Sequence, residues 1–314
     1  MSWLRRYLIP VFAACITLAV GIALGGGPLQ SAGADDSASL REDNQRLEDT
    51  LTGLESARVF DDAWTAALAP RVLDGRLADA QVTLVVLPGV SDDAVDDMRV
   101  AIEQAGGRAA AVVAVDADVL DPGKKTYVAS VADSSLSGAS GIDVPPETDV
   151  YARFGSLLAR AYVGSSASGG AFDDVAVKVD AELRGAKLVR IAEEPLRRGS
   201  LVVVLGAGDS GDEAVTEAAQ VIATELVVEL ARRADAVVVS TPPSGRVEGG
   251  LLDALSAGDD LAGLRVSTVN AGTTSGGLVS TVYALASALA DEPGDFGVVD
   301  GKAVLPPGFA SPSD

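Results

Sequence analysis

The chain has 314 residues, a net charge of −21 and a pI near 4.3. Because so acidic a surface repels nucleic acid, we exclude a nucleic-acid role. It has no histidine, and its one cysteine, Cys15, lies in an apolar N-terminal segment, which excludes an intrachain disulfide and a histidine- or thiol-based active site beyond that segment. Hydrophobic residues make up 48% of the chain but aromatic residues only 4%, so aliphatic side chains must build the core, as suits an α/β fold.

The N-terminal segment predicts a membrane anchor. Residues 8–24 (LIPVFAACITLAVGIAL) carry no charge and are long enough to cross a bilayer as a helix. Arg5 and Arg6 precede this run, which predicts a cytoplasmic N-terminus and an extracytoplasmic remainder. A signal peptide cleaved near Ala34 is the alternative, but the apolar run is longer than a usual signal core. We expect an uncleaved single-pass anchor over residues 1–34.

A helical stalk is predicted to follow over residues 35–78. Residues 25–37 are expected to be flexible, and Gly21 and Gly25 form a small-xxx-small pair that suits close packing of two membrane helices. Residues 40–60 predict a charged helix with a heptad seam. Leu40, Leu47 and Leu54 occupy d positions of this seam, and Asn44, Leu51 and Arg58 occupy a positions.

Asparagine at an a position selects the register of a parallel dimer, so we expect a homodimer joined by this short coiled coil. A single amphipathic helix folded back on the domain is the alternative. Residues 60–77 are expected to continue as a helix that breaks or bends near Pro70.

An extracytoplasmic α/β domain is predicted over residues 79–290. Apolar, β-branched runs alternate with amphipathic segments, a pattern that favours a doubly wound, mainly parallel sheet covered on both faces. Strands are expected at residues 81–87, 108–115, 201–205, 236–240 and 264–269. Helices are expected at residues 91–104, the first capped by Ser91, and at 213–234, 250–255 and 278–289.

Two parts of the chain depart from this rhythm. Residues 117–199 predict a helical insertion, with helices at about 149–163 and 173–183 after a Ser-, Gly-, Pro- and Asp-rich stretch at 121–147. The Pro- and Gly-rich tail at 291–314 is expected to be irregular.

Polar residues at the carboxyl ends of the strands form a candidate ligand cleft, because doubly wound sheets bind ligands there. They are Gly206, Gly208, Thr241, Asn270, Thr273 and Thr274. Gly206, Gly208 and Gly211 formally complete a dinucleotide pattern, but Asp209 and Asp212 place negative charge where a pyrophosphate would lie. We interpret this segment as a structural turn and expect no cofactor.

No catalytic constellation emerges from the remaining residues. Serine nucleophiles lack a histidine partner, and paired carboxylates such as Asp92 and Asp93 are typical of solvated helix faces. Met98 is the one soft metal ligand beyond the N-terminal segment, and a methionine on an amphipathic helix usually fills the core. We therefore expect a protein that is not an enzyme and has no metal-ligand set of its own.

The N-terminal sequence resembles the mycobacterial copper transport protein B (MctB) family of actinobacterial envelopes. The resemblance rests on RYLIPVF at residues 6–12, LAVGIALG at 18–25 and GPL at 27–29, followed by a coiled-coil segment, an α/β domain and a tail with LPP at 305–307. It covers nearly the full length. Members usually carry a histidine near the position of Tyr7, and this chain does not.

The resemblance implies copper homeostasis, by transport or efflux, and an outer-envelope or cell-wall setting. The residues themselves favour an alternative, a non-catalytic dimeric scaffold that holds envelope partners. A regulator of wall remodelling or division is an example.

Overall fold

The computed structural model describes residues 28–142, 144–145, 147–164, 169–192, 194–195, 197–207, 213–257 and 261–309, with side chains from residue 41 onward except at 213–216. The chain divides into two units between Asp61 and Asp62. The expected membrane anchor, with Gly21 and Gly25, lies outside the described residues. Within the described ranges, no helix combines the length and the apolar character that a membrane span requires.

The first described element is one long helix, α2, over Pro28–Leu73. It corrects the prediction of a flexible segment, because residues 28–37 are helical, in keeping with the helix-forming Leu, Gln and Ala residues that follow Pro28. The helix passes through Pro70 without a break and ends one turn later at Leu73, where the loss of one hydrogen bond near the terminus is tolerated.

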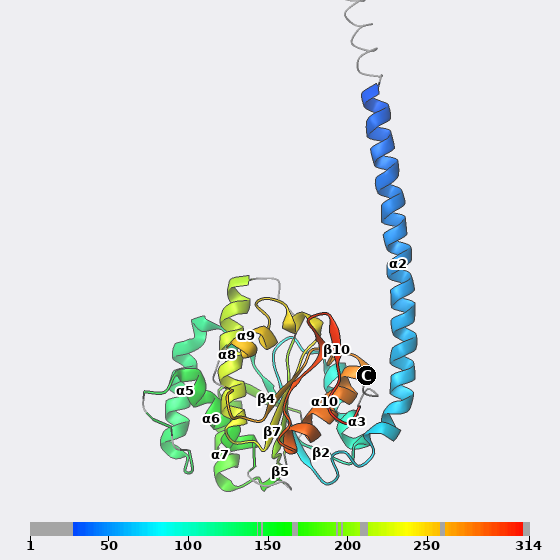
Figure 1. Ribbon diagram of the computed structural model, residues 1–314. Helices are drawn as coiled ribbons and strands as arrows, with labels where there is room; N and C mark the ends of the chain where they lie inside the picture. Colours follow the sequence, from blue (N-terminus) through cyan, green and yellow to red (C-terminus); the bar gives the residue numbers. More distant parts are fainter. Residues whose placement is uncertain are drawn as a thin grey trace, which may run out of the picture. The chain divides into compact units, whose positions relative to one another are not determined.

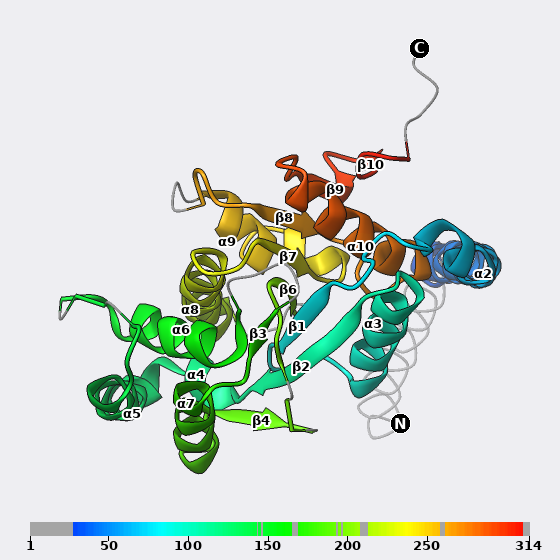
Figure 2. The same ribbon diagram turned by 90° about the horizontal axis from the view of Figure 1, so that it is seen from below.

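The second unit is built on an eight-stranded sheet with the order β10-β9-β8-β7-β6-β1-β2-β4 (Figures 1 and 2). The five strands predicted from the sequence pair with one another in parallel, which confirms the α/β class and the mainly parallel sheet. They are β1 (Gln81–Val86), β2 (Arg108–Val115), β6 (Leu201–Leu205), β7 (Ala236–Ser240) and β8 (Val266–Val269).

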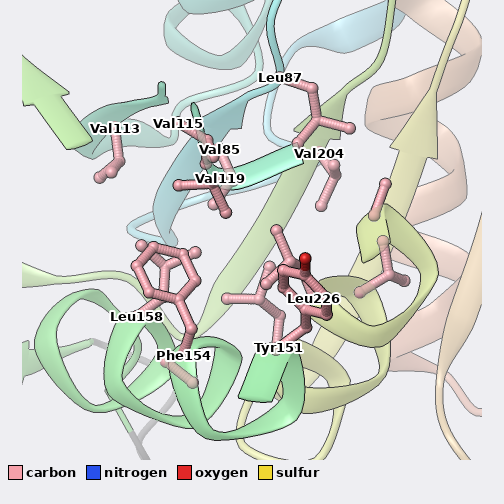
Figure 3. Packing of buried hydrophobic residues seen from close by; sticks show 14 of the residues in the cluster. Val85, Leu87, Val113, Val115, Val119, Tyr151, Phe154, Leu158, Val204 and Leu226 are labelled. Atoms are coloured by element: carbon pink, nitrogen blue, oxygen red, sulfur yellow. The ribbon is translucent and has the colours of Figure 1, made fainter. Parts of the chain in front are cut away.

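Alternate residues of these strands enter two separate cores, because successive side chains of a strand point to opposite faces. Leu84 and Val203 contact the core beneath the end of α2, α3 (Asp92–Gln104) and α10 (Ser275–Leu289). Val85 and Val204 enter the other core, where they face Phe154 and Leu226 (Figure 3). The second core lies beneath α4 (Ala117–Leu120), α5 (Lys125–Gly138), α6 (Val150–Tyr162), α7 (Asp174–Gly185), α8 (Glu213–Ala231) and α9 (Leu251–Ala257).

The connection through α10 differs in hand from the other crossovers. Strands β6 to β9 step in one direction along the sheet, and α8 and α9 pack on one face. Helix α10 connects β8 to β9 in the same direction but packs on the opposite face, beside α3 (Figure 2). Its crossover therefore has the opposite hand to those through α8 and α9, an uncommon arrangement for parallel strands.

The insertion is less purely helical than the sequence predicts. Helices α6 and α7 lie where they were expected, and a further helix, α5, forms within the Ser-, Gly-, Pro- and Asp-rich stretch at 121–147, where none was located from the sequence. Strand β4 (Val189–Ile191) also joins the main sheet, antiparallel to the end of β2, and β3 (Gly170–Ala171) pairs with β5 (Arg197–Arg198). The buried face of α5, where Val128 and Ala132 enter the core, explains its stability in tertiary context.

The tail is not irregular, contrary to the prediction. Strand β9 (Asp295–Val299) pairs in parallel with β8, and β10 (Lys302–Val304) folds back on β9. Phe296 fills the core, and Asn270 Nδ2 donates to the carbonyl of Val298 at 2.6 Å while Asn270 Oδ1 accepts from the Val298 amide at 2.7 Å. A buried polar side chain thus joins the tail to the end of β8.

Candidate functional site

The strand-end residues come from neighbouring strands, and their polar groups are used within the fold. Thr241 and Asn270 follow β7 and β8 and are almost fully buried. Thr241 Oγ1 donates to the carbonyl of Pro242 at 3.0 Å, and Asn270 bonds β9 as described above. Gly206, directly after β6, lies against Thr241: a Cβ added to Gly206 would be 2.9 Å from Thr241 Cγ2. These residues therefore pack the end of the sheet.

The loop before α10 likewise has a structural role. Thr274 is the N-cap of α10, where its Oγ1 accepts from the Gly277 amide at 3.0 Å and donates to the carbonyl of Ala271 at 2.9 Å. Thr273 is exposed beside it. Of the six predicted residues, the structure brings Gly206 and Thr241 together and places Thr273 and Thr274 at a helix cap. Gly208 lies outside the described residues.

A hollow that sequence reasoning did not find lies elsewhere, on the face of β2. We call it the β2 groove; its volume is about 740 Å³. Its floor consists of small, half-buried residues of β2, and its walls come from the start of α3, the loop after β1 and the chain around β4. The lining includes Leu87, Pro88, Asp92, Val95, Asp96, Arg99, Arg108, Ala110, Val112, Ala114, Arg190, Glu194 and Arg197.

The pattern of the sheet explains why this hollow exists. Strand β4 pairs only with residues 113–115 of β2, which leaves the first part of β2 without a neighbour from β4. Helix α3 packs over β2 on this face, whereas the larger helices of the insertion cover the opposite face (Figure 2). The alanines of β2 are too small to fill the space that remains, and this run of alanines was the available sequence signal.

The rim of the β2 groove carries both signs of charge. Arg99 Nη1 lies 3.4 Å from Asp96 Oδ1, and Arg190 Nε lies 3.7 Å from Asp116 Oδ2. Arg108 is exposed and makes no side-chain hydrogen bond or ion pair with the described residues. An aliphatic floor with an ionic rim suits contact with a polypeptide or another amphipathic group, because apolar contacts and rim charges can both be matched.

A buried polar network ties the insertion to the edge of this groove. Tyr162 Oη donates to Asp180 Oδ1 at 2.6 Å, and Arg184 Nη2 donates to Asp180 Oδ2 at 2.5 Å. Arg184 Nη1 also donates at 2.8 Å to Glu194, which lines the groove. Burial, reinforced by the hydrogen bond to Asp180 and its charge, raises the pKa of Tyr162 well above its ordinary value, so the phenol stays protonated.

A comparison with protein families identifies the relatives of this chain. The family model described as copper transport outer membrane protein, MctB, matches residues 1–307. The chain belongs to the MctB family. This membership confirms the resemblance inferred from the sequence, and the family's description is one of copper transport and an outer membrane setting. A search of curated proteins found no match.

The folded unit offers few soft side chains that could ligate copper. Met98, on α3, is fully buried at 0% exposure within the core, so its thioether contacts hydrophobic side chains rather than solvent. In the part of the chain that the structure describes, no three Asp, Glu, His or Cys side chains gather in a group that could hold a metal ion.

The heptad seam of α2 is exposed in the single chain. Leu47, Leu51 and Leu54 are 61%, 64% and 63% exposed, and Asn44 is exposed as well. Leu40 lies in α2, but its side chain is outside the described set. Exposed leucines at heptad spacing are the feature through which a second helix could pack here.

Proposed function

We propose that this MctB family protein serves copper transport as a membrane-tethered component whose folded unit does not itself ligate copper. One observation carries the proposal. Cu(I) prefers thiolate and thioether ligands and Cu(II) prefers imidazole, yet beyond residue 34 the sequence offers Met98 alone. That thioether lies in the core at 0% exposure.

Copper would then cross or leave the envelope along a path formed with other chains. The β2 groove, with its aliphatic floor and its ionic rim, is the surface that we propose for contact with a protein partner. Arg108 supports this proposal, because its exposed guanidinium is available to a carboxylate of a partner.

The proposal is tested by removing the soft ligands. We would complement a strain that lacks this gene with the wild-type chain, with Cys15→Ser and with the double variant Cys15→Ser, Met98→Leu. Leucine conserves the volume of methionine and costs less than about 1.5 kcal/mol in a core. The expected result is copper tolerance equal to that of the wild type for both variants. A fall of the double variant to the level of the deletion strain, at equal protein abundance, would contradict the proposal.

A dimeric envelope scaffold is a second candidate function, and the exposure of the α2 seam favours it. Leu47, Leu51 and Leu54 are each more than half exposed in the single chain, and a parallel dimer would bury their apolar surface away from water. Asn44 would fix the register of that dimer. A dimer could hold envelope partners, including those of wall remodelling or division, with no chemistry of its own.

The scaffold is tested by sedimentation of the full-length chain in detergent, together with recovery of partners from membranes. Leu47→Asp combined with Leu51→Asp should convert a dimer to a monomer. Val59→Asp is the matched control, because Val59 is 65% exposed on the same helix but lies off the seam. A wild-type chain that sediments as a monomer, or a dimer that resists the double substitution, would count against this candidate.

A further inference from the structure

Two arginines of the insertion and one that follows α8 gather around one carboxylate, near the start of β1. Arg160 Nη2 lies 2.9 Å from Asp173 Oδ1, and Arg198 Nη2 lies 3.1 Å from Asp173 Oδ2. Arg198 Nη1 also donates to the carbonyl of Arg160 at 3.3 Å. Arg233 follows α8, and its Nε donates at 3.2 Å to the carbonyl of Val163, just after α6. We call these three side chains the arginine cluster.

The arginine cluster carries more positive charge than its neighbours balance. Among the described residues, three guanidinium groups share the charge of Asp173, in a protein whose net charge is −21. Burial lowers the pKa of Arg233, and the charges of Arg160 and Arg198 lower it further. Like charges brought together away from water are costly unless anions pair with them.

Arg160 has an unused donor. The residue is 7% exposed, and its Nη1 is buried without a hydrogen-bond partner in the part of the chain that the structure describes. A buried donor left unpaired costs more than the hydrogen bond it would make, so such atoms are rare in folded proteins. The unpaired atom is an observation independent of the clustering of charge.

A cavity of about 260 Å³ adjoins the cluster. Arg233, Thr148 and Ser156 line it, and a Cβ added to Gly141 in its wall would lie 3.7 Å from Arg160 Nε. The acidic residue of the lining, Glu229, is already engaged: its Oε2 accepts from Ser156 Oγ at 2.6 Å and its Oε1 from Arg232 Nη1 at 2.6 Å. The cavity thus combines available positive charge with space for a small molecule.

We infer that the arginine cluster and this cavity form a binding site for an oxyanion, of the class of phosphate or a small phosphomonoester. Guanidinium groups match the oxygens of such anions in paired hydrogen bonds, and an oxyanion held by Arg233, the member of the cluster that lines the cavity, would offset the excess charge beside the buried Arg160 and the partly buried Arg198. The inference is independent of the proposed role in copper transport. The site lies near the start of β1, away from the carboxyl ends of the strands where ligands of doubly wound sheets usually bind.

The test uses the full-length chain purified in detergent, titrated with inorganic phosphate or glycerol phosphate against chloride at matched ionic strength. Thermal melting and calorimetry are the readouts. Arg233→Gln removes a guanidinium that lines the cavity. Arg265→Gln is the matched control, because Arg265 is 43% exposed just before β8 and makes the same change of charge outside the cluster and outside the β2 groove.

We expect a saturable rise in the melting temperature of the wild type with at least one of the two probes. Arg233→Gln should weaken that binding by about tenfold or more, the effect of losing one charged hydrogen-bonding group. Arg265→Gln should leave it unchanged. Absence of saturable binding of both probes to the wild type would overturn the inference, and so would equal binding by the two variants. A variant melting curve recorded without ligand shows whether Arg233→Gln is folded.

Discussion

The network of Tyr162, Asp180, Arg184 and Glu194 makes a quantitative prediction about how the insertion is held to the sheet. Asp180 is 1% exposed and accepts hydrogen bonds from Tyr162 at 2.6 Å and from Arg184 at 2.5 Å. Replacing Asp180 by alanine leaves the buried Tyr162 hydroxyl without this acceptor, which costs about 1–3 kcal/mol. Arg184 keeps Glu194 at 2.8 Å and is 35% exposed, so its charge remains solvated and adds little. We therefore expect Asp180→Ala to cost about 1–3 kcal/mol in total.

The assay is urea unfolding of the full-length chain, followed by circular dichroism, for the wild type, Asp180→Ala, Tyr162→Phe and the double variant. Tyr162→Phe removes the orphaned hydroxyl, so Asp180→Ala should cost less in that background. The expected coupling energy is about 1–2 kcal/mol. A cost of Asp180→Ala below about 1 kcal/mol, or effects that add within about 0.5 kcal/mol, would refute this account of the network.

Three further predictions concern Asp173, the clamp on the tail and the topology of the chain. Although burial acts in the opposite sense, hydrogen bonds and neighbouring arginine charges lower the pKa of Asp173, so its carboxylate stabilises the fold above about pH 4, and this contribution is lost as pH falls through the lower folded pKa. Asp173→Asn should therefore make the melting temperature depend less on pH in that range, and a melting temperature that falls with acid as steeply as in the wild type would contradict this. Asn270→Ala removes both hydrogen bonds to Val298 and should speed amide exchange in residues 295–304, with little change in β1; equal exchange in both strands would contradict the role of Asn270 as a clamp. Lys124 and Lys125 should react with an impermeant amine reagent on intact cells, and protection until lysis would contradict an extracytoplasmic domain.

The parallel strands could be predicted because their sequence carries the physical cause of their burial. The run LVVVL is apolar on both faces and QVTLVV is nearly so, which only a sheet covered on both sides can satisfy. Local capping was equally readable: Ser91 accepts from the Ala94 amide at 3.3 Å at the start of α3. Met98 was predicted as a core residue, and its complete burial confirms this.

The elements that the sequence did not reveal depend on partners distant in the chain. Strand β9 is short and begins at Asp295 in a Pro- and Gly-rich tail, and it forms because β8 offers an edge and Asn270 bonds its backbone. Strand β4 has three residues, too few to show a period. Helix α5 has a weak apolar face that becomes stable only against α6 and α7.

The candidate sites were missed for a related reason. The β2 groove exists because nothing large covers the alanines of β2, and a sequence shows which residues are small but not what lies above them. The arginine cluster joins Arg160, Arg198 and Arg233, which are far apart in the sequence and carry no motif. Conversely, Thr241, Asn270 and Thr274 have the composition of a ligand site, but their hydrogen bonds lie within the fold.

The measurement that tests the central claim most directly is Cu(I) binding by the purified full-length chain carrying Cys15→Ser, in detergent and without oxygen, in competition with a chromophoric Cu(I) chelator. Met98→Leu in the same background is the matched comparison. The account predicts no stoichiometric copper at dissociation constants tighter than about micromolar, and no difference between the two chains. Retention of one copper ion per chain at such an affinity would contradict the claim that the folded unit serves copper transport without ligating the metal.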